Sequence, residues 1–263
     1  MKATILLFVS LLVLLTSSGA SGQDEPSGTL CGRWVSAAKK PVAEGLVLFF
    51  DESLGPPPLP ERYWRGADET AITDAAGHFC SDLPPGKYFV GAVKRKKGNE
   101  MGPLRKGDTY TLSRDGKGRP KQFFLGSGER VDIGTIRGGR TYRKAYRMDG
   151  ITAIRGTVRD ERGEPAAGVL VLAYPSPDMG GRPLYVSDKT GKDGTFLLRL
   201  GTAGKFYLKI RNNYGGGQPE AGEIMGGYGE FGNPAPVAVR KGTVTTGIDI
   251  GGIRFPGRGQ RGH

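Results

Sequence analysis

Few residues of this chain have the types and spacing that catalysis or metal binding requires. The only histidines are His78 and His263, so a histidine-based zinc site or a Ser-His-Asp relay would have to recruit the last residue. The chain contains neither a His-x-x-Glu pair nor the Cys-x-x-Cys-His pattern of haem attachment. We therefore expect no enzyme activity, no cofactor and no bound metal.

Two further motifs match functional patterns only by composition. Residues 227–232 fit Gly-x-Gly-x-x-Gly, but a dinucleotide site needs a strand before the motif and a helix after it, and neither is indicated. Residues 188–194 resemble a calcium loop, yet Lys189 and Lys192 would oppose a cation and a terminal glutamate is missing. We interpret the first segment as a glycine-rich loop and the second as a β-turn.

Three other features could support binding, and the first is a repeated loop motif. Arginine, two glycines and an acid recur in the order Arg95, Gly102, Gly107, Asp108 and again Arg211, Gly217, Gly222, Glu223. One interpretation is conformational, with glycines adopting positive φ and the carboxylate pairing with the arginine. The alternative is that each occurrence of the motif forms a pocket for a small ligand or a partner.

Aromatic side chains in two loops are the second feature. Tyr214, Tyr228 and Phe231 lie among glycines in residues 212–232, and Trp64 follows the proline-rich run 55–60. Exposed rings could stack on sugars or dock a partner. The alternatives are that the loop folds onto a sheet and buries its rings, and that the proline-rich run is a rigid loop without a partner.

Positive charge is the third feature. The 263 residues include 38 Lys and Arg against 26 Asp and Glu, a formal net charge of +12. A polyanion partner fits this balance, as does a merely solubilising surface. No nucleic-acid fold signature accompanies the charge, so specific nucleic-acid binding is not expected. The candidate basic patch consists of Lys94, Lys96, Lys97, Arg137, Arg140, Arg143, Lys144 and Arg147.

The chain begins with the three-part pattern of a secretory signal peptide. A basic Met1-Lys2 start precedes an apolar run over residues 3–16 and then small residues. We predict a signal peptide over residues 1–22, cleaved after Ala20 or Gly22, and a periplasmic or secreted mature chain with no transmembrane span. In such a compartment the two cysteines favour a Cys31–Cys80 disulfide, with two free thiols as the alternative.

The elements that carry these residues are repeated. Five blocks recur in the same order, including Leu30–Trp34 with 154–158 and Val131–Ile136 with 248–253. Strand-like alternation, turn-rich separators and the absence of capped helical spacing predict an all-β chain. The predicted parts are a β-sandwich at 24–138, a basic linker at 139–149, a second β-sandwich at 150–255 and a basic tail at 256–263.

Alternation also places the cysteines. Cys31 and Cys80 both fall on outward positions of their strands, between inward residues such as Trp34 and Phe79. Two outward cysteines can pair only if their strands are neighbours in one sheet. A disulfide therefore requires the strands at residues 29–35 and 78–83 to lie side by side.

The repeated pattern resembles the carboxypeptidase regulatory-like domain, a transthyretin-like (prealbumin-like) sandwich grouped with carbohydrate-binding-like folds. The resemblance rests on Gly-x-Val, Pro-x-x-Gly-Val-x-Val, Thr-x-x-x-Gly-x-Phe and Leu-Pro-Pro-Gly-Lys-Tyr. The first copy keeps the last motif intact at 83–88, whereas the second has Leu200–Phe206 without the proline pair. The resemblance implies two tandem Ig-like or transthyretin-like sandwiches and specifies fold rather than activity.

These patterns together predict a non-enzymatic binding or interaction module of the cell envelope or secreted matrix, with a protein, glycan or polyanion partner. One alternative is a carbohydrate-binding protein that uses the loop aromatics. The other is an accessory docking subunit of an exported enzyme or surface assembly.

Overall fold

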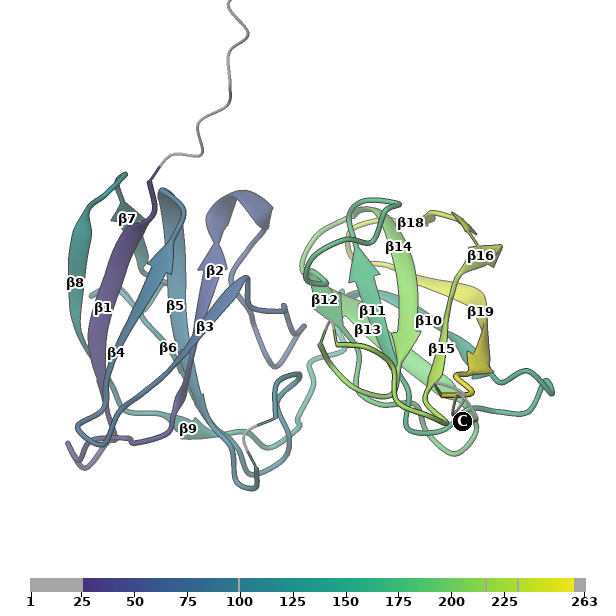
Figure 1. The fold of residues 1–263 in the computed structure, drawn as a ribbon, viewed down its shortest axis with the longest axis horizontal. Coiled ribbons are helices and arrows are strands. Elements are labelled where there is room, and N and C mark those ends of the chain that lie inside the picture. The colour runs from purple at the N-terminus through teal and green to yellow at the C-terminus, as the bar shows by residue number, and fades with distance from the viewer. Residues whose placement is uncertain (1–25, 99, 216, 231, 258–263) are drawn as a thin grey trace, which may run out of the picture.

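The computed structural model describes residues 26–257 except 99, 216 and 231. The predicted signal peptide, Phe231 and most of the predicted tail lie outside the described residues. The described chain is built from β-strands and one short 3-10 helix, η1 (Glu52–Leu54), so the predicted all-β class is confirmed. Two groups of strands stand beside each other, each folded around its own core (Figure 1).

The first group forms two sheets. Strands β4, β1 and β8 make one sheet, and β3, β2, β5, β6 and β9 make the other, with β7 pairing with β5. The sheets enclose an apolar cluster that includes Leu30, Trp34 and Phe49. The strands are β1 (Gly28–Val35), β2 (Leu46–Asp51), β3 (Glu69–Ile72), β4 (His78–Leu83), β5 (Gly86–Lys94), β6 (Thr109–Leu112), β7 (Gln122–Leu125), β8 (Arg130–Arg137) and β9 (Arg140–Thr141).

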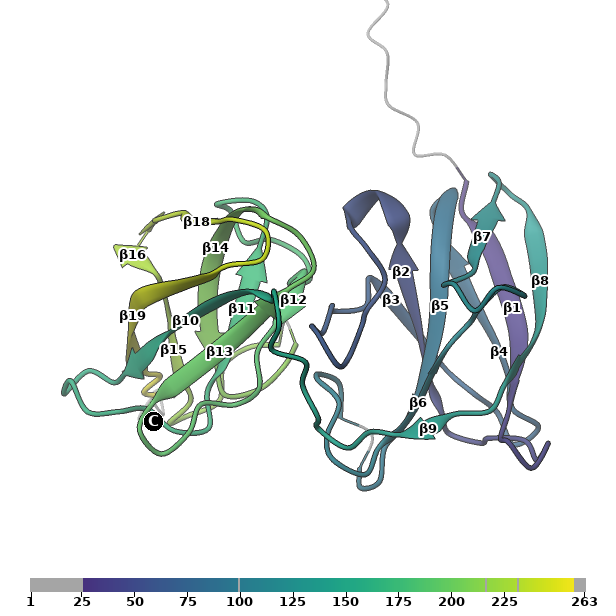
Figure 2. The same cartoon turned by 180° about the vertical axis from the view of Figure 1, so that it is seen from behind.

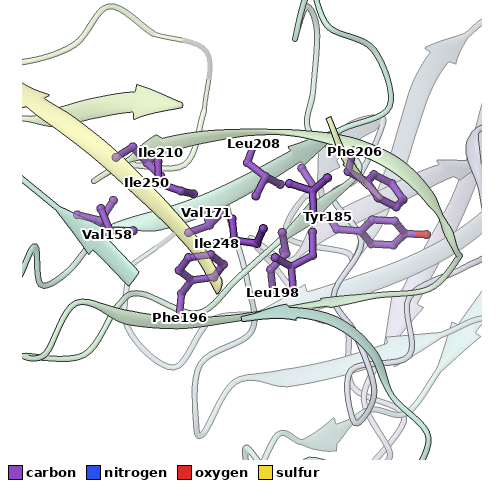
Figure 3. Packing of buried hydrophobic residues seen from close by; sticks show 14 of the residues in the cluster. Val158, Val171, Tyr185, Phe196, Leu198, Phe206, Leu208, Ile210, Ile248 and Ile250 are labelled. Atoms are coloured by element: carbon purple, nitrogen blue, oxygen red, sulfur yellow. The ribbon is translucent and has the colours of Figure 1, made fainter. Parts of the chain in front are cut away.

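The second group wraps one long sheet around its core. The order is β12-β11-β14-β15-β19-β10-β13, and β18 pairs with β14. Inward side chains such as Val158, Phe196 and Ile250 fill the space between its strands (Figure 3). The strands are β10 (Thr152–Arg159), β11 (Leu170–Tyr174), β12 (Tyr185–Val186), β13 (Thr195–Leu200), β14 (Gly204–Arg211), β15 (Ile224–Gly227), β16 (Gly229–Glu230), β17 (Asn233–Pro234), β18 (Val237–Val239) and β19 (Val244–Arg254).

Three strands of each group are paired in the same way. β1 is antiparallel to β4 and parallel to β8, and β10 is antiparallel to β13 and parallel to β19. Each parallel pair contains a register shift, and Gly134 and Gly247 lie in the extra residues with φ of 76° and 77°. Ile136 lies opposite Trp34, and Ile250 lies opposite Val158, the residue that corresponds to Trp34. Ile136 therefore corresponds to Ile250, whereas the fifth sequence block set it against Ile253. The predicted register of that block is wrong.

The predicted disulfide is present. Cys31 faces Cys80 directly in the β1–β4 ladder, with their Cα atoms 4.1 Å apart, and the two form a disulfide bond. Phe79 is buried, as its inward position requires. The strands at 29–35 and 78–83 are thus neighbours in one sheet, which is the arrangement that the alternation pattern demanded.

A third apolar cluster joins the two sandwiches. It contains Leu48 and Phe50 of β2 together with Leu170 and Leu172 of β11. Since successive residues of a strand face opposite sides, the alternate residues of β2 and β11 fill the two separate cores. The run Leu46–Phe50 is therefore continuously apolar because both of its faces are covered.

The segment predicted as a basic linker is packed against both sandwiches. β9 pairs with β6, Tyr142 is buried, and the Arg147 amide donates to the Glu61 carbonyl oxygen at 2.9 Å. The Tyr146 hydroxyl donates to Asp188, and the Arg199 guanidinium lies 3.6 Å from the centre of the Tyr146 ring. The segment thus holds the sandwiches together through specific contacts.

Candidate functional site: a basic hollow on the first sandwich

A hollow of about 630 Å³ opens on the first sandwich. This volume lies within the range of about 300–1,000 Å³ that is usual for ligand sites. The hollow runs across β5 and past β6 to β8, and the segment 58–60 lies along it. Its lining combines apolar side chains with cations, and it contains no Asp or Glu.

The hollow exists because β8 and β6 do not pair. The chain turns sharply after β8 at Gly138 and Gly139, with φ of 77° and 156°, and then runs along β6 as β9. The Trp34 indole N–H donates to the Gly138 carbonyl oxygen at 2.9 Å and anchors the turn to the core. β8 therefore forms an edge of its sheet and lies at the outer side of the first sandwich (Figure 2), where four of its residues line the hollow.

The second sandwich closes the corresponding side. β19 continues without a break to Arg254 and pairs with β15, so that one sheet wraps around the core. Glycines make this close approach possible. A side chain on Gly226 would collide with the Gly251 backbone, and one on Gly252 would come within 2.7 Å of the Ile224 side chain. On the first sandwich, the strands that line the hollow carry Thr111 and Thr135.

Four cations surround the hollow, namely Arg114, Lys121, Arg137 and Arg140. Lys121 lies over the Phe123 ring, with its Nζ 4.8 Å from the ring centre. Arg114 donates to the Gly118 carbonyl oxygen at 2.6 Å. Arg137 is exposed and has no ion-pair partner within the described part of the chain. The cationic groups therefore keep capacity to bind an anion.

Glu61 partly balances one of these cations from outside the hollow. Its carboxylate lies 2.8 Å from the Arg140 guanidinium and accepts a hydrogen bond of 2.5 Å from the Tyr110 hydroxyl. Burial alone raises the pKa of the Glu61 carboxyl, but the Tyr110 hydrogen bond and the charges of Arg140 and Arg114 outweigh it and lower that pKa. Glu61 thus stays ionised and fixes Arg140 in place, and it also interacts with Arg114 at longer range, whereas Arg114, Lys121 and Arg137 form no close ion pair among the described residues.

The inner surface of the hollow mixes apolar and hydroxyl groups. Phe123, Ile133 and Ile136 belong to the core of the first sandwich or pack against it, and they also line the hollow. The Ser113 hydroxyl oxygen is buried there and has no hydrogen-bond partner among the described residues. An unpaired buried hydroxyl destabilises the folded state, but because this oxygen is buried it is not exposed to a ligand in the hollow.

The repeated arginine and acid residues are structural. Arg95 donates to Asp108 at 2.7 Å and to the carbonyl oxygens of Glu100, Gly102 and Pro103, and both charged side chains are 2% exposed. The loop between β5 and β6 thus folds around one ion pair. Its donors are occupied by the loop itself, as the conformational interpretation predicts.

The second loop is built in the same way. Arg211 donates to both oxygens of Glu223, at 2.6 and 3.0 Å, and to the Gly217 carbonyl oxygen. The Glu223 hydrogen bonds raise the pKa of Arg211, and the Arg211 hydrogen bonds lower the pKa of Glu223. Neither pair lines the hollow.

The loop aromatics pack against the protein. Trp64 is 7% exposed and belongs to the cluster between the sandwiches, so the prediction that it offers a stacking face is wrong. Tyr214 is half-buried beside the first sandwich: a Cβ on Gly66 would lie 2.7 Å from its hydroxyl, and burial raises its pKa to about 12. Tyr228 is half-buried against the second core, and Phe231 lies outside the described residues. The loop has folded onto the sheets.

The predicted basic patch is dispersed. Arg137 and Arg140 lie at the hollow, whereas the Lys94 ammonium donates to the Ala43 carbonyl oxygen at 2.9 Å. The Lys144 ammonium lies 3.5 Å from Asp188. The remaining members are exposed and are not part of the hollow: Lys96, Lys97, Arg143 and Arg147.

Sequence reasoning missed Arg114, Lys121 and the hydroxyl residues of the hollow. The only available signal was the alternation Tyr110–Arg114 followed by the turn at 115–119, where a half-buried strand leads into a basic hairpin. That signal predicts a strand, but it does not predict that β8 fails to pair beside it.

Within the described ranges, no group of three or more His, Cys, Asp and Glu residues could hold a metal ion. His78 is exposed at a turn, with its Nδ1 3.7 Å from the Asp74 carboxylate. In the same residues, no helix has the length and apolar character needed to cross a membrane.

Comparisons with known proteins return remote structural likenesses. No family model matches the chain, so the carboxypeptidase regulatory-like resemblance stays a prediction. No curated protein matches it. The Bacillus anthracis TIE protein is 13% identical, with a TM-score of 0.26, over 87% of this chain and 34% of that one.

A streptococcal ancillary pilin is 14% identical, with a TM-score of 0.25, over 88% of this chain and 63% of that one. BcpA, the major pilin subunit of Bacillus cereus, is 10% identical, with a TM-score of 0.24, over 87% of this chain and 100% of that one. This chain thus spans about a third of the TIE protein and under two thirds of the ancillary pilin. TM-scores of this size give no basis for assigning the function of these proteins to this chain.

Proposed function

We propose that this chain is an exported, non-enzymatic interaction module built from two tandem β-sandwiches, and that it binds an anionic partner in the hollow of the first sandwich. The observation that carries the proposal is the lining of the hollow, in which four cations and an apolar floor occur without a carboxylate. A ligand pocket with a few convergent charged groups on apolar walls is the usual form of a binding site.

Export is supported by the Cys31–Cys80 disulfide, because structural disulfides persist in oxidising compartments. The predicted signal peptide points to the same compartment. An envelope or matrix location would supply anionic partners in quantity. The alternative of an accessory subunit is compatible with this proposal, because the anionic partner can be part of a larger exported assembly.

The hypothesis that loop aromatics stack on carbohydrate has less structural support than the hypothesis of anion binding. Of its proposed platforms, Trp64 is buried, and Tyr214 and Tyr228 pack against the sandwiches. A neutral glycan would therefore meet no free-standing tryptophan or tyrosine among these residues.

Binding of fluorescent poly-L-glutamate and heparin to residues 23–263, at low and high salt, tests the proposal. The double variant Arg137→Glu with Lys121→Glu reverses two charges at the hollow, and Lys96→Glu with Lys97→Glu makes the same charge change outside it. We expect at least about tenfold weaker binding for the first variant and little change for the second, because exposed charges act over about a Debye length of 10 Å at 0.1 M salt. Equal losses in both variants would show only general electrostatic attraction.

A further inference from the structure

We propose that the hollow accepts an extended acidic segment of another polypeptide, which adds to the first sandwich as a strand along β8. The inference rests on the proposed function and names the chemical class of its anionic partner. It follows from two independent properties of the hollow: the backbone edges beside it and the distribution of its side chains.

The backbone edge is the first property. β8 pairs with β1 on one side only, whereas its counterpart β19 pairs with β10 on one side and β15 on the other. An edge strand presents a row of unpaired N–H and C=O groups, and an extended peptide can pair with such a row. β8 is eight residues long, so its edge could pair with a segment of several residues.

The opposite wall adds a shorter edge. β6 pairs with β9 only through Thr109 and Tyr110, and its last two residues, Thr111 and Leu112, pair with β5 alone. Thr111 and Leu112 both line the hollow, and neither pairs with β9 on the side away from β5. Both walls of the hollow therefore offer backbone groups to an inserted main chain.

The side chains supply the second property. A strand projects its residues alternately to opposite faces. Toward the interior of the hollow such a segment would meet Phe123 and Ile136, and toward solvent it would meet Arg114, Lys121 and Arg137. A segment that alternates apolar and acidic residues would satisfy both faces at once.

Natural sheets usually protect their edges by covering, bulging or charging them. The β8 edge has a bulge at Gly134, cations at its ends, Arg130 and Arg137, and one acid, Asp132, which accepts a hydrogen bond from the Gly134 amide. The net positive charge of this edge repels a second copy of the same edge, but it attracts an acidic strand. The edge is therefore arranged against self-association and in favour of an acidic partner.

The test measures the binding of four octapeptides with capped termini to the chain lacking the predicted signal peptide. The first alternates Glu and Val, and the second has the same composition with its four Glu and four Val in separate blocks. The third and fourth are the alternating peptide N-methylated at every second residue, in the two possible patterns. Binding is measured by fluorescence anisotropy, and backbone hydrogen exchange is followed over β6 and β8. Heparin serves as an anion without a peptide main chain.

We expect the alternating peptide to bind at least about tenfold more tightly than the block peptide, one or both methylation patterns to lose binding, and amides of Arg130–Arg137 to gain protection. Equal binding of the methylated and unmethylated peptides would overturn strand addition. Heparin binding that depends on Arg137, without peptide binding, would overturn this inference and leave the proposed function standing. Failure of both heparin and peptides would overturn the proposed function as well.

Discussion

Tyr63 provides a direct test of how the two sandwiches are joined. It lies in the connection between β2 and β3 of the first sandwich, yet its ring is part of the core of the second and is 6% exposed. Its ring centre is 5.8 Å from that of Tyr185, with an angle of 87° between the planes. Its hydroxyl donates to the Pro57 carbonyl oxygen at 2.7 Å.

Two magnitudes follow from this geometry. Replacing a large buried aromatic side chain with alanine costs about 3–5 kcal/mol, so Tyr63→Ala should lower the free energy of unfolding by roughly that amount. An edge-to-face aromatic pair contributes about 0.5–1.5 kcal/mol beyond its burial. The double-mutant cycle of Tyr63→Leu and Tyr185→Leu should therefore show a coupling energy of that size.

The assay is urea unfolding followed by near-ultraviolet circular dichroism, with the slope against urea compared among variants. Tyr207→Leu, at a partly exposed tyrosine of β14, is the control and should change stability by no more than about 0.5 kcal/mol. If the Tyr63 and Tyr185 substitutions were additive within about 0.3–0.5 kcal/mol, the proposed contact between the sandwiches would be refuted.

Three further predictions concern stability. Replacing Cys31 and Cys80 with serine opens a loop with a sequence separation of 49 and should lower the free energy of unfolding by about 4 kcal/mol on the chain-entropy model, as measured by urea titration; no change would contradict that model. Because Arg211 lowers the pKa of Glu223 below its ordinary 4.5, stability should fall as the pH drops below about 4.5, and Glu223→Gln should flatten that decline; an unaltered pH profile would exclude the pair as its source. A Cβ at position 156 would overlap the Ile248 backbone, so Gly156→Ala should destabilise the protein by about 1–3 kcal/mol in thermal unfolding, and a neutral effect would show that β10 and β19 can separate.

The fold class and the disulfide were accessible from the sequence because they depend on local periodicity. Alternation at Leu30–Trp34 and around Phe79 set the inward and outward faces, and the pairing of Cys31 with Cys80 followed from those faces. The register of the fifth block was not accessible, because residues 248–253 resemble Val131–Ile136 more closely in sequence than their structural counterparts, residues 245–250, do.

The interface and the hollow depend on distant contacts that no local pattern records. The apolar run Leu46–Phe50 signals a strand buried on both faces, but nothing in it indicates that the second cover is β11 of the other sandwich. The hollow depends on a turn at Gly138 and Gly139, which directs the chain to β6 and leaves β8 unpaired. Charge alone suggested a wide basic patch, whereas the structure brings only Arg137 and Arg140 of that patch to the hollow.

The most direct test of anion binding in the hollow fills the hollow without altering charge. Thr135 lines the hollow on β8, and Thr246 is an exposed threonine on the corresponding strand, β19. We predict that Thr135→Trp weakens binding of poly-L-glutamate at least about tenfold, roughly 1.4 kcal/mol, while Thr246→Trp leaves the dissociation constant within about twofold of the unmodified chain. Equal binding by both variants and the unmodified chain would contradict the assignment of the hollow as the binding site.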